Sequence, residues 1–297
     1  MVNDLDEAYA FCERIARAHY ENFPVASLLL PRPLRPHVAA VYAFARAADD
    51  FADEGELGRD ERYDLLDGWL VRLRSAEGSR QPGPAPRSGE PDGTPQIFHA
   101  LGATIREKRL PLRLFEDLLS AFRQDVGVGR YATWDDVLDY SSRSANPVGR
   151  LVLRIAGYED ARLDSWSDAI CTALQLTNFW QDVKPDFERG RVYLPRQQAE
   201  AYAADEADLN APQASKPWRL ALAAAVARTR GLYEAGRPLC DALNGRLRLE
   251  LRATWLGGMR ILNRIERADF DVLARRPTLG AVDLGWLTWR VATWVPR

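Results

Sequence analysis

The chain has 297 residues, of which 46% are hydrophobic and 28% are charged, and its formal net charge at pH 7 is −2. This length and apolar content suit one or two domains with a sizeable core. Because acidic and basic residues are interspersed and nearly balanced, the sequence does not indicate a nucleic-acid partner. The three cysteines, Cys12, Cys171 and Cys240, fit neither a disulfide framework nor a zinc site, which favours a reducing compartment.

The composition of the two ends of the chain, and the length of its apolar runs, indicate how the protein relates to a membrane. The first residues are acidic and contain no apolar core of a signal peptide. No apolar run reaches the roughly 18 residues that a membrane span requires, so we predict a cytoplasmic protein. Residues 286–297 combine tryptophan with arginine, a composition found at membrane interfaces. We favour a packed C-terminal segment, and the alternative is peripheral contact with the inner membrane face.

Helical patterning dominates the sequence, and no stretch shows the sustained alternation or hairpin signals of strands. We expect helices over residues 4–21, 38–54, 61–74, 96–108, 112–126, 133–143, 164–183, 218–243 and 247–274. The segment 78–95 is rich in Gly, Pro, Ser and Arg and predicts a flexible surface loop. The pattern as a whole predicts an all-α single domain of residues 1–297.

Local signals predict where several helices begin or end. Thr133, followed by Asp135 and Asp136, is typical of a capped helix N-terminus. Pro185 should kink or end a helix near Gln181, because proline removes one backbone hydrogen bond and pushes against the carbonyl four residues earlier. Further breaks are expected at 146–149, 236–238 and 257–258.

A first group of chemically suggestive residues lies in the stretch 38–54. Tyr42, Arg46, Asp49 and Asp53 fall within about 60° around the expected helix. Two carboxylates one turn apart repel each other by several tenths of a kcal/mol, and a hard divalent cation such as Mg²⁺ would offset that repulsion. For one such motif taken alone, a solvated acidic face is the better interpretation.

A second group lies in the stretch 175–195. Its amide and carboxylate side chains share roughly one quadrant of a helix beside an apolar flank; they are Gln175, Asn178, Asp182 and Asp186. Directly afterwards, the guanidiniums of Arg189 and Arg191 could hold a phosphate. Two such motifs, each next to arginine, suggest two helices that face each other across metal and diphosphate.

The segments YAFARAADDFADE and QLTNFWQDVKPDFERGRVYLP resemble the two aspartate-rich signatures of the squalene/phytoene synthase family. The resemblance covers nearly the whole chain, and ENFPVASLLLP, SANPVGRL and the glutamine before Asp182 are most similar to the bacterial hydroxysqualene synthases of hopanoid pathways. It implies the isoprenoid synthase fold, a helical bundle around a central apolar cavity with the two aspartate helices at its mouth.

The resemblance also implies roles for individual residues. A cluster of about three Mg²⁺ ions would be held by Asp49, Asp53, Asn178, Asp182 and Asp186. The leaving diphosphate and its waters would be contacted by Tyr42, Arg46, Gln175, Arg189, Arg191 and Tyr193. The family's phosphate-contacting segment falls on His19, Tyr20, Glu21, Asn22 and Phe23, and Gln181 replaces a common arginine. Candidate walls for the carbocation are Phe23, Phe122, Tyr131, Phe179 and Phe270.

The implied reaction converts presqualene diphosphate and water to hydroxysqualene, with release of diphosphate. One alternative is head-to-head condensation of two farnesyl or geranylgeranyl diphosphates to presqualene diphosphate, squalene or phytoene. For the first reaction we expect no NADPH, and the chain lacks a strand-bound GxGxxG fingerprint.

Two further readings belong to other classes of protein. The chain could be a non-catalytic homologue that binds a prenyl lipid or acts in assembly. A di-iron bundle would need Glu-x-x-His pairs, and His19, His37 and His99 follow no glutamate at that spacing. The sequence does not indicate an oligomeric state.

Overall fold

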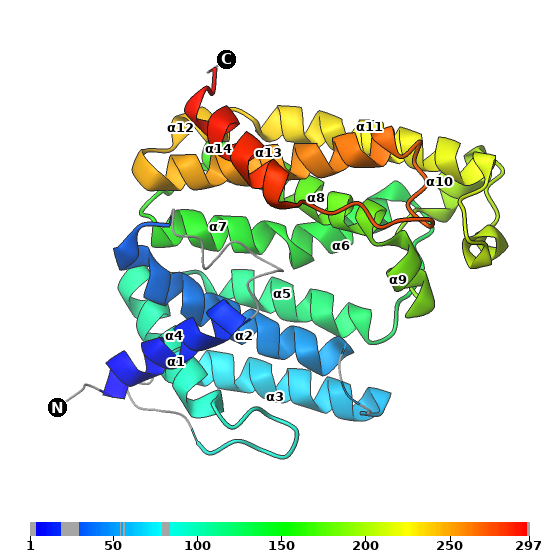
Figure 1. Cartoon of the computed structure of the whole chain (residues 1–297). Coiled ribbons are helices and arrows are strands. Elements are labelled where there is room, and N and C mark those ends of the chain that lie inside the picture. Colours follow the sequence, from blue (N-terminus) through cyan, green and yellow to red (C-terminus); the bar gives the residue numbers. More distant parts are fainter. Residues whose placement is uncertain (1–3, 19–29, 54, 56, 79–83, 296–297) are drawn as a thin grey trace. The chain divides into compact units, whose positions relative to one another are not determined.

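The computed structural model describes residues 4–18, 30–53, 55, 57–78 and 84–295. In this part of the chain every regular element is a helix, apart from one isolated bridge between Arg130 and Val192 (Figure 1). The elements are α1 (Asp4–Ala18), η2 (Arg32–Leu34), α2 (Arg35–Asp53), α3 (Arg59–Gly78), α4 (Thr94–Lys108), α5 (Leu112–Asp125), α6 (Trp134–Ser144), α7 (Asn146–Ile155), α8 (Ala161–Gln181), α9 (Val183–Glu188), α10 (Arg196–Ala201), η3 (Glu206–Asn210), α11 (Lys216–Gly236), α12 (Leu239–Ala242), α13 (Gly245–Arg267) and α14 (Ala281–Ala292). The all-α prediction is confirmed.

The helices form two units. The first comprises Met1–Gly127 and Pro147–Asp160, and the second comprises Val128–Asn146 and Ala161–Arg297. The first aspartate motif therefore belongs to the first unit and the second motif to the second. The single domain and the convergence of the two motifs stay predictions.

In the first unit, α2 packs against α1, α3, α4 and α5. Its buried face is rich in alanine and carries Phe44, which lies 5.5 Å from the Phe115 ring and 6.0 Å from Trp69. The Trp69 indole N–H donates to the Phe44 carbonyl at 3.2 Å, so the buried polar atom has a partner. With this face in the core, the opposite face of α2 presents its polar side chains.

In the second unit, α8 packs against α6, α11, α12 and α13. Two buried polar contacts connect α8 to α11: Trp180 Nε1 donates to Thr229 Oγ1 at 2.8 Å, and Thr177 Oγ1 lies 3.0 Å from the Tyr233 hydroxyl. Such fully satisfied buried contacts favour one register of packing over its neighbours. The C-terminal end of α8, where the second motif begins, is thereby fixed against the core.

Several predicted boundaries are confirmed. Thr133 caps α6 in a capping box, in which Thr133 Oγ1 accepts from Asp136 N–H at 3.2 Å and Asp136 Oδ2 accepts from Thr133 N–H at 2.8 Å. The predicted break at 146–149 falls one residue early, at Ala145, and residues 146–149 form the first turn of α7. The break at 236–238 separates α11 from α12.

The predicted break at Gly257 and Gly258 is wrong, because α13 runs through both residues. The reason is close packing rather than chain reversal: a Cβ on Gly258 would lie 1.9 Å from the Tyr233 hydroxyl. The helix ends instead at Arg267, where Asp269 and Phe270 adopt positive φ. It therefore stops short of the predicted end at 274.

The described part of segment 78–95 contains a contact that its composition does not suggest. Glu90 and Arg72 are both buried and form a bidentate ion pair with distances of 2.9 and 2.7 Å. Arg72 also donates to the carbonyls of Pro84 and Ala85. Residues 84–90 are thus tied to α3, while the predicted flexibility of the whole segment stays a prediction.

Candidate active site

The second aspartate motif sits on a helix break that the sequence predicts. Helix α8 ends at Gln181, Asp182 has φ −108° and ψ 20°, and α9 begins at the next residue. Pro185 requires this break, because in a continuous helix its ring would push against the Gln181 carbonyl. The Asp186 N–H donates to the Asp182 carbonyl at 2.9 Å. The two aspartates therefore remain one turn apart despite the proline.

Asp182 is paired with a residue that the sequence analysis did not identify. Arg276 donates to both carboxylate oxygens, through Nε to Oδ1 and through Nη2 to Oδ2 at 3.0 Å. One residue before the aspartate, Gln181 Nε2 donates to the Pro277 carbonyl at 2.6 Å. The segment after α13 thus lies directly against the second motif. No local signal marks this contact, because its partners are 94 and 96 residues apart.

A stack of aromatic rings adjoins the second motif. Phe179 and Tyr193 lie face to face, with ring centroids 3.7 Å apart and planes within 3°. Tyr131 stacks on Tyr193 at 5.7 Å, and Tyr140 lies 6.1 Å from both Phe179 and Tyr193. Tyr131, Phe179 and Tyr193 are all buried. Three predicted site residues are therefore brought together here, and Tyr140 joins them although the sequence analysis did not single it out.

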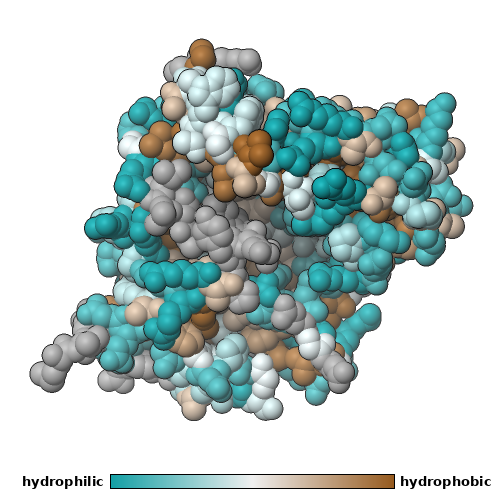
Figure 2. All heavy atoms as spheres, in the orientation of Figure 1, coloured by the Kyte–Doolittle hydropathy of each residue, from teal (hydrophilic) through white to brown (hydrophobic). Residues whose placement is uncertain are grey.

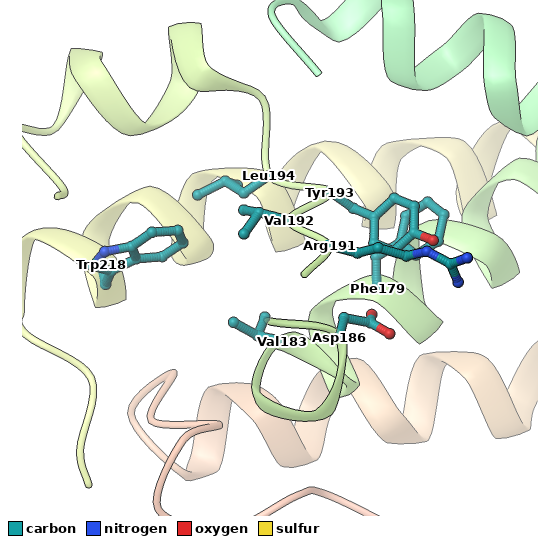
Figure 3. Close-up of a pocket in the computed structure, with 8 residues that line it drawn as sticks. All are labelled: Phe179, Val183, Asp186, Arg191, Val192, Tyr193, Leu194 and Trp218. Atoms are coloured by element: carbon teal, nitrogen blue, oxygen red, sulfur yellow. The ribbon is translucent and has the colours of Figure 1, made fainter. Parts of the chain in front are cut away.

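Phe179 and Tyr193 of this stack line a small pocket together with the end of the motif (Figure 3). The Asp186 carboxylate, the Arg191 guanidinium and the Tyr193 hydroxyl lie at one end of the pocket in Figure 3. Apolar side chains line the other end, namely Val183, Leu194 and Trp218. The pocket therefore has a polar, ionisable end and an apolar end.

The segment that carries Arg191 and Tyr193 is held in place by residues 129–132. Val192 N–H donates to the Gly129 carbonyl at 2.9 Å, and Arg196 N–H donates to the Tyr131 carbonyl at 3.0 Å. Gly129 must be a glycine for this approach, because a Cβ there would lie 2.5 Å from the Gly190 carbonyl oxygen. The backbone after α9 is thus positioned as an extended segment, which holds the Tyr193 ring against Phe179.

The first motif, in the first unit, is organised around Arg46. Its guanidinium lies 3.7 Å from Asp49 and 2.6 Å from Asp50, three and four residues further along α2. Asp50 was not among the predicted site residues, although its spacing of one helical turn from Arg46 is the signal that could have found it. Asp53, at the end of the helix, is exposed.

Tyr42 lies one turn before Arg46 on the same helix and is half-buried. Burial is the largest influence on its hydroxyl and raises the pKa of Tyr42; Arg46 lowers that pKa, and Asp49 and Asp50 raise it. The phenol therefore stays protonated at neutral pH and can donate a hydrogen bond.

The remaining predicted residues are placed as follows. On α8, Gln175 is half-buried and Asn178 is exposed. Arg189 is exposed at the end of α9, and Phe270 lies half-buried in the left-handed turn after α13. Phe122 is buried in α5, in the first unit. His19, Asn22 and Phe23 lie outside the described residues, as do Tyr20 and Glu21.

The donor set of the two motifs consists of carboxylate and amide oxygens, which are the ligands that Mg²⁺ prefers. Within the parts of the chain that the structure describes, no three His, Cys, Asp or Glu side chains gather at one point as a preformed metal site. The Asp182 carboxylate is instead neutralised by Arg276. The chemistry of the donors thus fits a hard cation, whereas the predicted assembly of the two halves stays a prediction.

Comparisons with known proteins agree with the sequence resemblance. Residues 16–283 match the family model described as squalene/phytoene synthase. The chain is 37% identical over 233 residues to a hydroxysqualene synthase of Zymomonas mobilis, covering 75% of this chain and 71% of the relative. It is 36% identical over 251 residues to a hydroxysqualene synthase of Rhodopseudomonas palustris, covering 84% and 80%. Among solved structures, it is similar to the squalene synthase HpnC from Alicyclobacillus acidocaldarius, with a TM-score of 0.79 and 40% identity over 90% of this chain and 96% of that one.

Proposed function

The chain belongs to the squalene/phytoene synthase family, and on that premise we propose that it converts presqualene diphosphate and water to hydroxysqualene and diphosphate. The predicted isoprenoid synthase fold is confirmed, and the chain is an enzyme of this family, so the non-catalytic alternative is set aside. The support for this specific reaction comes from the relatives named hydroxysqualene synthases, which match most of the chain at 36–37% identity.

The second motif supports a prenyl diphosphate as substrate. Such a molecule has a polyanionic head and an oily tail, and the second motif places Asp186, Arg191 and the Tyr193 hydroxyl beside the apolar side chains of Val183, Leu194 and Trp218. Arg191 and the Tyr193 hydroxyl would contact diphosphate oxygens, since both are donors on the same side of the aromatic stack. The half-buried Tyr42 and Arg46 on α2 would supply further donors if the two motifs meet.

Asp49, Asp53, Asn178, Asp182 and Asp186 would hold Mg²⁺ ions. When bound, these ions would neutralise the charge that develops on the leaving diphosphate. At Asp182, the Arg276 guanidinium donates to both carboxylate oxygens and would compete with a metal ion for them. If the metal displaces it, Arg276 would become available to the diphosphate itself.

The aromatic stack would stabilise the cation left after ionisation. The carbon–oxygen bond to diphosphate breaks and its electron pair leaves with the diphosphate. The faces of Phe179, Tyr193, Tyr131 and Tyr140 attract positive charge and contain no strong nucleophile. A water molecule then forms the new carbon–oxygen bond and gives up one proton. No hydride is transferred, so the proposed reaction needs no NADPH.

A second candidate reaction is favoured by one comparison. The structure from Alicyclobacillus acidocaldarius, 40% identical to this chain, is named a squalene synthase. Condensation of two farnesyl diphosphates would require the same ionisation chemistry, with a second prenyl chain in place of water as the nucleophile.

The products of the purified chain with Mg²⁺ and no reductant test the proposal. Presqualene diphosphate should give hydroxysqualene and one equivalent of diphosphate, whereas farnesyl diphosphate alone should be left unchanged. Turnover of farnesyl diphosphate without turnover of presqualene diphosphate would establish the second candidate instead.

A further inference from the structure

Helix α14 packs against α13, and its most buried side chain is an aspartate. In Figure 1 it crosses the front of α13, and Asp283 is the one residue of α14 that is buried. The Asp283 carboxylate accepts hydrogen bonds from Gly280 N–H at 2.7 Å and Arg260 Nε at 2.9 Å, and also from Arg264. The charged cluster therefore anchors the helix, and Trp286, Leu287 and Val291 are half-buried beside it.

Three large apolar side chains of α14, namely Val282, Leu284 and Trp289, remain exposed. Among the described residues, nine large hydrophobic side chains are exposed, and five of them lie in 279–295. Val282 is 83% exposed and Trp289 is 58% exposed, one on each end of the helix. In Figure 2 brown and pale spheres gather where α14 crosses the surface. Such a concentration of exposed apolar groups marks an interaction surface. The sequence-based preference for a packed C-terminal segment stays a prediction: Trp294 lies 5.5 Å from the Trp255 ring and donates to Asp241, whereas Trp289 is exposed.

The charges of this segment have one sign at the surface. Asp283 and Arg290 are the ionisable residues within 279–295, and Asp283 is sequestered with its two arginines. Arg290 lies 5.9 Å from the Trp286 ring and 5.8 Å from the Trp289 ring, and Arg260 lies 4.8 Å from Trp286. Tryptophan beside arginine is the combination that settles at the boundary between lipid headgroups and acyl chains.

We propose that α14 is an interfacial helix that binds the surface of a bilayer rich in anionic lipid. None of the described helices is long and apolar enough to cross a membrane, and α14 itself has 12 residues, so the contact is peripheral. The helix lies in the plane of the interface, with Val282 and Trp289, which fall within about 20° of each other around the helix, inserted and Arg290 at the headgroups. A second copy of the chain is a poorer occupant, because an isologous contact through residues 279–295 would offer no opposite surface charge to Arg290. This inference rests on the exposed face of α14 and does not require the proposed reaction.

Co-sedimentation of the full chain with vesicles tests the proposal. Binding is expected to vesicles of phosphatidylglycerol and phosphatidylcholine, and weaker binding to phosphatidylcholine alone. The double variant Val282→Asp, Trp289→Asp should bind the anionic vesicles roughly tenfold or more weakly, because it removes two inserted groups and adds two charges that the lipid repels. Arg290→Glu should weaken binding to anionic vesicles and leave binding to phosphatidylcholine unchanged.

Val71→Asp is the matched control, since Val71 on α3 is 56% exposed and far from α14 in sequence. It should bind anionic vesicles like the unaltered chain. Equal binding by the double variant and the unaltered chain would overturn the proposal. So would a concentration-dependent dimer that the double variant abolishes, together with no vesicle binding, because α14 would then be covered by a second copy.

Discussion

The two aspartate motifs are paired with arginine in opposite ways. In the first motif the arginine is the more buried partner: the Arg46 side chain is 15% exposed, and the Asp49 side chain is 41% exposed. In the second motif the carboxylate is the more buried partner: the Asp182 side chain is 15% exposed, and the Arg276 side chain is 49% exposed. Arg46 comes from the same helix, whereas Arg276 comes from 94 residues further along the chain.

This inversion indicates different roles for the two arginines. Arg46 is fixed within α2 and leaves Asp49 accessible, so it can remain in place when a cation approaches. Arg276 donates to both oxygens of Asp182, and its side chain is about half exposed to solvent. We therefore infer that it is an exchangeable counterion. We expect the arginine beside the aspartate to stay in place in the first motif and to be exchangeable in the second.

The largest effect is expected from removing the aspartates themselves. Asp49→Ala and Asp182→Ala should each lower Mg²⁺-dependent diphosphate release at least about 100-fold, because electrostatic stabilisation of a leaving group typically supplies several kcal/mol. If both motifs serve one metal cluster, the double variant should be hardly worse than either single variant, since residues that act as a unit are not additive. This measurement tests the convergence of the two motifs directly.

Asp135→Ala provides the control, because Asp135 is an exposed residue in the first turn of α6. It should keep full activity. Diphosphate release that persists in Asp49→Ala and Asp182→Ala would refute the assigned sites, and strictly multiplicative losses would argue for two independent sites.

Local features of the fold and the site were predictable from the sequence. The capping box at Thr133 and the helix end before Pro185 depend on residues within one turn of each other, so the sequence displays both partners. The pairing of Arg46 with Asp50 also had a visible spacing and could have been found. Arg276 could not, because nothing near Asp182 shows which distant residue the chain brings back to it. The wrong prediction of a helix break at Gly258 has the same cause, since the residue that requires a glycine there, Tyr233, is on another helix.

The contrast between local and distant contacts can be measured at Gly258. Gly258→Ala should destabilise the protein by about 2 kcal/mol, because overpacking costs about 1–3 kcal/mol and the new Cβ would meet the buried Tyr233 hydroxyl. Gly231→Ala, on α11, has no atom within 4 Å of the new Cβ and should be neutral or stabilising by up to about 1 kcal/mol. Urea unfolding midpoints would compare them, and equal midpoints would show that α13 and α11 pack less closely than described.

A purely local contact should matter less. Thr133→Ala removes the acceptor for the Asp136 N–H at the start of α6 and should cost about 1 kcal/mol. Thr133→Ser keeps the acceptor and should be nearly neutral. The same urea unfolding measurement applies, and a loss in the serine variant as large as in the alanine variant would mean that the methyl group, not the cap, stabilises this turn.

The smallest effect, and the sharpest test of the inversion, concerns Arg276. Because this guanidinium would compete with a metal ion for the Asp182 oxygens, Arg276→Gln should bind Mn²⁺ more tightly than the unaltered chain in the absence of substrate. A half-exposed ion pair contributes at most about 1 kcal/mol, which corresponds to a gain of up to about fivefold in affinity. Arg46→Gln should not show this gain, because Arg46 lies closer to Asp50 than to the proposed ligand Asp49. Isothermal titration with Mn²⁺ would separate the two variants. A weaker Mn²⁺ affinity in Arg276→Gln would mean that Arg276 holds Asp182 in its binding geometry rather than competing for it.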